Sequence, residues 1–126
     1  MKKIISTDKA PQAIGPYSQG VKAGGLVFFS GQIPLDPATG EIKGETTAEQ
    51  AGQVMENIAA VLGAAGIGFE AVVKTTIFMT DLADFAAVNE VYGRYFPGEP
   101  PARSTVQVAA LPRGARVEIE VTAMEG

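Results

Sequence analysis

The residues best suited to chemistry lie near the end of the chain, in the stretch PPARSTVQVAALPRGARVEIEV at positions 100–121. Arg103 follows two prolines, Pro100 and Pro101, and opens a run that is typical of a β-strand. A planar guanidinium on such a stiffened segment suits the capture of a carboxylate through two parallel hydrogen bonds. The residue type alone favours a plainer interpretation, in which Arg103 pairs with a strand glutamate on the surface and contributes little stability.

The second strand of this stretch carries the candidate carboxylates, Glu118 and Glu120. Either one could position or activate a water molecule. Side chains alternate along a strand, so Glu118 and Glu120 share one face, as do Arg103, Thr105 and Gln107 on the strand before. The two polar sets could meet if the strands formed a hairpin, whereas a third strand between them would keep them apart. Without further information, a solvated charged face explains the two glutamates better than an acid–base pair does.

Three further candidates lie in the first quarter of the chain. Tyr17, in the loop sequence IGPYSQG, could close over a ligand and lend its hydroxyl, or it could anchor the loop against the sheet. Ser30 and Gly31 end the run LVFFSG, where a hydroxyl and a backbone N–H could hold a substrate oxygen. The alternative for Gly31 is a bulge or turn at the end of a strand. Ser30 is a poor nucleophile, because the chain has no histidine to activate it.

Composition excludes several classes of protein. The chain has 126 residues, enough for a single domain over 1–126, and its 46% hydrophobic content can build a core. It contains no Cys and no His, which removes disulfides, thiol nucleophiles, Ser-His triads and the common zinc and transition-metal ligand sets, so no metal is expected. Any proton transfer must therefore use Asp, Glu, Tyr, Lys or water.

Charge and hydropathy limit the partners and the location. A net charge of −4 argues against general binding of nucleic acid, and no cluster of Lys and Arg would attract anionic lipid. The motifs GxxxxGK[ST] and GxGxxG are absent. No apolar run approaches the length of a membrane span, and the start MKKIISTDKAPQ has too short an apolar run for a signal peptide, so the cytosol is the expected location.

Two helices and six strands must position these residues. The apolar periodicity predicts a first helix over 47–65, with Thr47 and Gln50 at capping-box spacing and Gly66 as its left-handed C-cap. Asp81 is expected to cap the second helix, on which Asn89 falls within the apolar stripe and would need a hydrogen bond if it were buried. The strands are expected in the segments KIIS, VKA, LVFFSGQI, AVVKTTIFMT, ARSTVQVAAL and RVEIEVTAM, with a two-glycine hairpin at Gly24-Gly25.

The element order β-β-β-α-β-α-β-β predicts an α+β protein with one mixed six-stranded sheet. Strands joined through a helix are expected to run parallel, and strands joined by short turns antiparallel. Both helices should then pack on one face of the sheet. The other face, rich in β-branched and apolar residues, should be covered by another subunit.

Five segments carry a resemblance to a known family: APQAIGPYSQGV, SGQIPLDPATGEI, QAGQVMENIAAVL, VVKTTIFMTDLADFAAVNEVY and PPARSTVQVAALPRGARVEIEV. Their order and spacing resemble the reactive intermediate deaminase (Rid, YjgF-type) family almost from end to end. The resemblance implies a chorismate-mutase-like fold, a homotrimer and clefts between subunits. It also implies hydrolysis of enamines and imines such as 2-aminoacrylate and 2-aminocrotonate to 2-keto acids and ammonia, without a cofactor.

The resemblance assigns roles to the candidate residues. Arg103 matches the family arginine that binds the substrate carboxylate, and Glu118 matches the glutamate that holds and polarises the attacking water. Glu120 then has a structural or surface role. Other positions match residues that line the same cleft: Tyr17, Ser30, Asn89 and, through its backbone, Gly31. Thr105 stands where many deaminating relatives have a cysteine, which excludes a thiol mechanism and leaves the substrate range open.

Two other functions remain as alternatives. A keto-acid binding or regulatory protein would keep the pocket without turnover, but it would need only Arg103 and not Glu118. Some relatives have been described as translation inhibitors or ribonucleases. Such a role fits least well with an acidic chain that lacks histidine.

Overall fold

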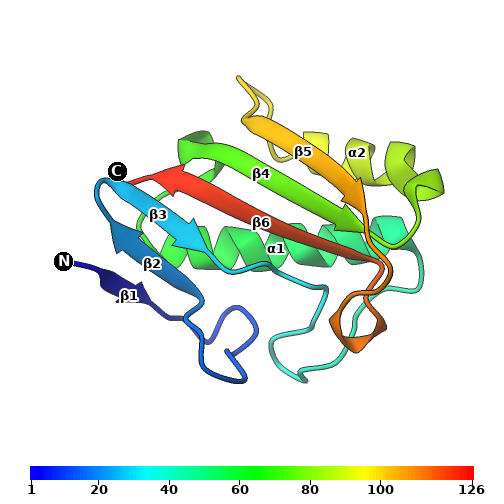
Figure 1. Cartoon of the computed structure of the whole chain (residues 1–126), viewed down its shortest axis with the longest axis horizontal. Helices are drawn as coiled ribbons and strands as arrows, with labels where there is room; N and C mark the ends of the chain where they lie inside the picture. The colour runs from blue at the N-terminus through cyan, green and yellow to red at the C-terminus, as the bar shows by residue number, and fades with distance from the viewer.

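The computed structural model describes all 126 residues and confirms the mixed six-stranded sheet with two helices (Figure 1). The strands are β1 (Lys3–Ile5), β2 (Gly20–Ala23), β3 (Leu26–Phe29), β4 (Val72–Met79), β5 (Ala102–Gln107) and β6 (Val117–Met124). The helices are α1 (Thr47–Ala64) and α2 (Phe85–Gly93), and short 3₁₀ turns cover Phe69–Ala71, Leu82–Asp84 and Pro112–Gly114. The predicted order of elements is therefore confirmed.

The strands lie in the order β1-β2-β3-β6-β4-β5, and only β4 and β5 run parallel to each other as neighbours. The predicted parallel crossover through a helix is confirmed, since α2 joins these two strands. The last two strands, β5 and β6, do not form a hairpin, because β4 lies between them. The two-glycine hairpin is confirmed: Ala23 pairs with Leu26, and Gly24 and Gly25 both take positive φ angles.

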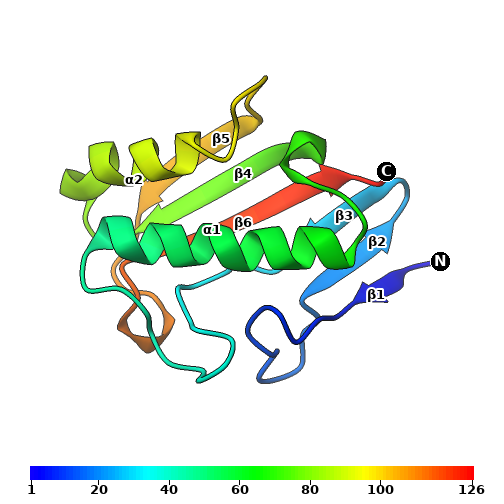
Figure 2. The same cartoon turned by 180° about the vertical axis from the view of Figure 1, so that it is seen from behind.

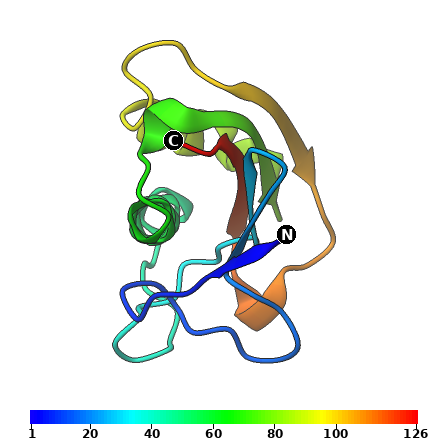
Figure 3. The ribbon, with the colours of Figure 1, turned by 90° about the vertical axis from the view of Figure 1, so that its left-hand side faces the viewer.

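Both helices pack on one face of the sheet, as Figures 2 and 3 show. Alternation along β6 buries one set of side chains against the helices: Val117, Ile119, Val121 and Ala123. They meet the apolar stripe of α1, which includes Val54, Ile58, Val61 and Leu62. Neither helix is long and apolar enough to span a bilayer.

The other face of the sheet, called the open face below, carries no helix. Large apolar side chains on it remain exposed, among them Phe28 and Val106, at 47% and 40% of their surfaces. The bare apolar face predicted from the sequence is therefore confirmed. A monomeric protein would leave this surface in contact with water.

The N-cap of helix α1 lies one residue earlier than predicted. The capping box joins Thr46 to Glu49, and the prediction of Thr47 and Gln50 was wrong. Both pairs have the same spacing, but the hydroxyl of Thr47 donates instead to the carboxylate of Asp84, 2.8 Å away. Local spacing alone does not distinguish the two pairs, because the difference depends on a contact with Asp84, in the 3₁₀ turn that precedes α2.

Replacing Thr46 by alanine is expected to lower the free energy of unfolding by about 1 kcal/mol. The substitution removes the hydroxyl that accepts a hydrogen bond of 3.1 Å from the backbone amide of Glu49. Chemical denaturation measures the loss, and Thr46→Ser, which keeps the hydroxyl, is the control. Equal losses in both variants would contradict the assignment of the cap.

The capping box also makes part of the stability depend on pH. Hydrogen bonds from the backbone amides of Thr46 and Glu45, together with one from the Thr46 side chain, lower the pKa of Glu49. A carboxylate with a lowered pKa stabilises the fold above its unfolded pKa and loses that effect as the pH falls through the lowered value.

Candidate active site

The seven candidate residues fall into two groups on one protomer. The first group surrounds Glu118 and is called the carboxylate half-site; it contains Tyr17, Ser30, Gly31 and Glu118. The second group lies between β5 and α2 and is called the guanidinium half-site; it contains Asn89, Arg103 and Thr105. The strand register places Arg103 and Glu118 on opposite faces of the same sheet.

Arg103 points toward the helices. It pairs in register with Thr75, whose side chain is buried and lies 2.7 Å from the hydroxyl of Tyr92 on α2. Glu118 pairs with Phe78, and residues 75 and 78 of β4 project to opposite sides. Glu118 therefore points to the open face, away from Arg103 of the same protomer.

Helix α2 builds a seat for the Arg103 guanidinium. Nη1 of Arg103 donates to Oδ1 of Asn89 at 2.7 Å. The guanidinium carbon lies 5.0 Å from the ring centroid of Tyr92 and 5.5 Å from that of Phe85, distances at which aromatic faces attract a cation. No other N–H of this guanidinium is hydrogen-bonded, so the fork remains available to an anion.

This seat changes two interpretations from the sequence. Arg103 does not pair with Glu118 or Glu120, because the sheet separates them. Asn89 is exposed rather than buried, and it accepts its hydrogen bond from Arg103. The spacing of Phe85, Asn89 and Tyr92 on α2 was visible in the sequence, but that they form a seat for Arg103 was not, since it depends on β5 lying beside α2.

Thr105 follows Arg103 by two residues on β5 and shares its side of the strand. It pairs in register with the buried Ile77, and its own side chain is half-buried. The guanidinium half-site thus combines three polar groups at the edge of the sheet: the guanidinium of Arg103, with N–H groups still unpaired, the amide of Asn89 and the hydroxyl of Thr105.

Glu118 is half-buried on the open face, although it is flanked in sequence by two core residues. Burial raises its pKa above the ordinary glutamate value, and the negative charge of Glu120 raises it further. A carboxylate with a raised pKa accepts a proton more readily near neutral pH, which is the property that a general base requires. Glu120 lies on the same face but is exposed, as the sequence predicted.

Gly31 lies directly against this carboxylate. A Cβ at position 31 would lie 2.9 Å from Cδ of Glu118 and would overlap Oε2. The backbone of Gly31 does not have a positive φ, so a turn is not the reason for glycine at this position. The close approach of Glu118 is the reason.

Replacing Gly31 by alanine is expected to push the Glu118 carboxylate outward and to lower its pKa toward the ordinary value, because the carboxylate would be less buried. A ¹³C NMR titration of Glu118 measures this change. Gly52→Ala is a matched control, since nothing lies within 4 Å of a Cβ at that helical position. An unchanged Glu118 pKa in Gly31→Ala would contradict the steric argument.

Ser30 and Tyr17 complete the carboxylate half-site. The hydroxyl of Ser30 donates to the carbonyl of Ser18 at 2.6 Å, and its amide donates to the carbonyl of Gln19 at 3.0 Å. Ser30 therefore ties the Tyr17 loop to the end of β3. Tyr17 is 52% exposed and is free to contact a ligand.

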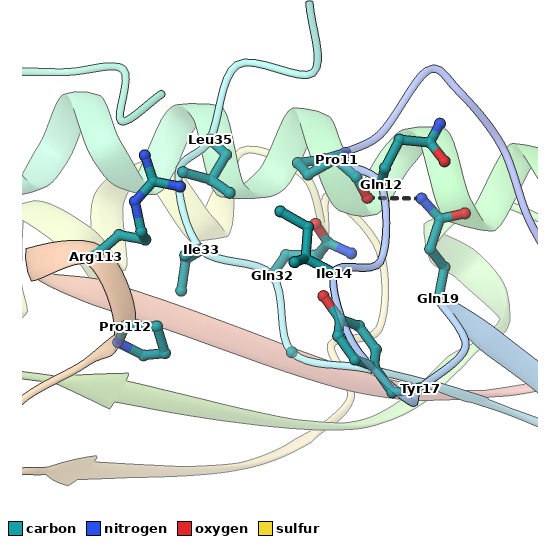
Figure 4. Close-up of a pocket in the computed structure, with 11 residues that line it drawn as sticks. Pro11, Gln12, Ile14, Tyr17, Gln19, Gln32, Ile33, Leu35, Pro112 and Arg113 are labelled. Atoms are coloured by element: carbon teal, nitrogen blue, oxygen red, sulfur yellow. Dashed lines mark hydrogen bonds between the residues drawn. The ribbon is translucent and has the colours of Figure 1, made fainter. Parts of the chain in front are cut away.

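A cavity of about 360 Å³ opens beside this half-site, between the loop that carries Tyr17 and the turn at 112–114 (Figure 4). Gly31 and Tyr17 both belong to its wall, and Gly31 also lies against Glu118. The lining residues are Pro11, Gln12, Ile14, Tyr17, Gln19, Gly31, Gln32, Ile33, Leu35, Pro112 and Arg113. No local sequence pattern indicates that the 112–114 turn lies near Tyr17.

Known proteins are similar to this chain in sequence and in fold. The family model described as Endoribonuclease L-PSP matches residues 7–125. Protein DfrA of Myxococcus xanthus is 62% identical, over 98% of this chain and 95% of the relative. A mouse protein named 2-iminobutanoate/2-iminopropanoate deaminase is 51% identical, over 100% of this chain and 93% of its own.

A solved structure is similar over nearly its full length. The crystal structure of Escherichia coli TdcF with bound serine is 49% identical and superposes with a TM-score of 0.93, covering 98% of this chain and 99% of that one. The family match, the two relatives and this fold lead to one conclusion. The chain belongs to the reactive intermediate deaminase (Rid) family, whose family model is described as Endoribonuclease L-PSP.

Proposed function

We propose that the protein hydrolyses 2-imino acids and their enamine tautomers, of the 2-iminobutanoate and 2-iminopropanoate type, to 2-keto acids and ammonia. The observation that carries the proposal is the presence, on one small chain, of a guanidinium with a free fork and a half-buried glutamate with a raised pKa. The first suits the carboxylate of such a substrate, and the second suits activation of water. The mouse relative is named for this activity.

The proposal requires more than one protomer. Arg103 and Glu118 lie on opposite faces of a sheet, so they can act on one small substrate only if they come from different copies. The exposed apolar side chains of the open face support contact with a second copy there. The family resemblance supports a homotrimer, with one cleft at each subunit interface.

The chemistry follows from the two groups. Arg103 binds the substrate carboxylate, and Glu118 of the neighbouring copy orients a water molecule toward C2 of the protonated imine. As the C–O bond forms, Glu118 takes a proton from the water, and a carbinolamine results. Glu118 then gives this proton to the nitrogen, and the deprotonated Glu118 takes the proton of the hydroxyl group as the C–N bond breaks. Ammonia leaves, the C=O bond of the keto acid forms, and Glu118 releases its proton to the solvent.

Only a modest acceleration is needed, because these imines also hydrolyse in water. Placement of the substrate and one general base together supply about 10²–10⁴-fold or more. Thr105 cannot replace the chemistry of a thiol, so the mechanism uses no thiol step. Its hydroxyl is available to line the cleft beside Arg103.

One experiment tests the function. A serine dehydratase generates 2-aminoacrylate in place, and the appearance of pyruvate is followed with and without the protein. Wild type should accelerate the reaction, and Arg103→Ala should not. Arg94→Ala should behave as wild type, since the Arg94 side chain is exposed and pairs only with Glu90. Binding of pyruvate without acceleration would favour a keto-acid binding protein instead. The expected cytosolic location belongs to the same proposal and is tested by cell fractionation.

Phe85 is expected to matter for substrate affinity through the seat that it gives Arg103. Phe85→Leu should raise KM about two- to five-fold with kcat unchanged, because it removes one aromatic face beneath the guanidinium. Phe85→Tyr keeps the face and should retain the wild-type KM. Phe85 is 38% exposed, so neither change disturbs the core. An equal KM in all three proteins would show that the ring does not position Arg103.

A further inference from the structure

The cavity beside the carboxylate half-site has one charged residue in its wall, Arg113. Much of the wall is apolar and includes Ile14, Ile33 and Leu35. Its volume of about 360 Å³ lies within the range of small-molecule sites. Gly31 lines this cavity and also lies against the carboxylate of Glu118, so only a residue without a side chain lies between Glu118 and the cavity.

Arg113 is held in an unusual backbone conformation. Its φ of 60° and ψ of 19° are left-handed, and no other residue except glycine has a positive φ in this chain. Gly114 follows with a φ of 71°. A left-handed arginine is strained, and such strain is concentrated at functional sites. A glycine at position 113 would adopt this turn without strain, so the turn itself does not require arginine.

The Arg113 side chain has no partner. It makes neither a hydrogen bond nor an ion pair, unlike Arg94, Arg103 and Arg116. The other polar side chains of the cavity wall are the phenol of Tyr17 and three neutral amides, so no carboxylate in the wall competes for the guanidinium. Figure 4 shows Arg113 across the cavity from Ile14 and Tyr17.

We propose that this cavity receives the side chain of the substrate and that Arg113 binds a second acidic group there. The protein would then accept 2-imino and 2-keto dicarboxylic acids as well as small apolar ones. This inference rests on the proposed function, because the first carboxylate is assigned to Arg103 of the neighbouring copy. The two guanidinium groups would hold the two ends of one ligand, with Glu118 and Gly31 between them.

Binding of three keto acids to the wild-type protein tests the inference by calorimetry. The probes are 2-oxobutanoate, 2-oxoglutarate and 5-methyl-2-oxohexanoate, in which an isopropyl end replaces the second carboxylate. Wild type should bind 2-oxoglutarate about ten-fold more tightly than its isopropyl analogue, because a charge-assisted pair forms only with the acid.

Variants of Arg113 test the contribution of its side chain to the preference for 2-oxoglutarate. Arg113→Gly suits the left-handed backbone, so it removes the guanidinium without adding strain, and it should abolish the preference for 2-oxoglutarate. Arg113→Lys should keep most of the preference. Arg94→Gln removes a remote surface charge and should leave all three affinities unchanged. The affinity for 2-oxobutanoate should not change in any of these variants.

The outcomes separate this inference from the proposed function. If 2-oxobutanoate binds but 2-oxoglutarate binds equally well to wild type and Arg113→Gly, the inference is overturned and the proposed function stands. Tighter binding of the isopropyl analogue than of 2-oxoglutarate would likewise overturn it, since the cavity would then favour apolar chains. If none of the keto acids binds to the wild-type protein, both proposals fail.

Discussion

Glu118→Gln is expected to remove most of the acceleration of imine hydrolysis, a loss of about 10²–10⁴-fold, because glutamine cannot take a proton from the attacking water. Glutamine keeps the size of the side chain, so the packing against Gly31 is preserved. The measurement is the rate of keto-acid appearance with 2-aminoacrylate generated in place. Binding of 2-oxobutanoate to Glu118→Gln should remain, since Arg103 still holds the carboxylate.

The matched control is Glu120→Gln, two residues along the same strand and on the same face. It should keep the wild-type rate at neutral pH. The charge of Glu120 raises the pKa of Glu118, so its removal should lower that pKa. The activity requires the deprotonated form of Glu118, and the loss of activity at acid pH should therefore occur at a lower pH in Glu120→Gln than in wild type.

Rates from about pH 4 to about pH 8 cover the titration of an ordinary glutamate and of one with a raised pKa. A wild-type rate of keto-acid appearance in Glu118→Gln would show that Glu118 is not the general base. If the rate falls at the same acid pH in wild type and in Glu120→Gln, the carboxylates of Glu118 and Glu120 do not interact in the assembled protein.

The second large effect is recovery of activity from two inactive variants. Arg103→Ala and Glu118→Gln should each be inactive alone. When they are denatured together and refolded as a mixture, some clefts receive an intact Arg103 from one copy and an intact Glu118 from its neighbour. About one quarter of the wild-type activity should return from an equal mixture in a closed symmetric ring, because each cleft takes the two residues independently.

A control mixture tests whether activity returns from refolding alone, without an intact Arg103. Arg103→Ala refolded with the double variant Arg103→Ala/Glu118→Gln provides no intact arginine, and it should stay inactive. If the mixture of the two single variants also stays inactive while each variant still forms oligomers, the two half-sites do not meet across an interface.

Much of the fold could be predicted from local sequence. Gly24 and Gly25 between two β-prone runs predicted the hairpin, and the periodicity of 47–65 predicted α1 to within one residue at its C-terminal end. Alternation in RVEIEVTAM predicted which side chains of β6 enter the core. These features depend on contacts between residues that are close in the sequence, so local sequence patterns predict them.

The candidate site was only partly predictable, since its geometry depends on contacts between distant segments. Which face Arg103 occupies relative to Glu118 depends on β4 lying between β5 and β6. The reason for glycine at position 31 depends on a side chain 87 positions later in the sequence. The unpaired, left-handed Arg113 leaves no signal in a run of Pro, Arg and Gly that reads as an ordinary turn.

The placement of Arg103 and Glu118 on opposite sides of one sheet makes the activity depend on the concentration of the protein. Under the proposed mechanism, an isolated chain has each reactive group but no complete cleft, and it is therefore inert. Turnover per chain would then fall steeply on dilution below the concentration at which the copies associate. A cell could switch such a catalyst on or off through the number of copies that it makes.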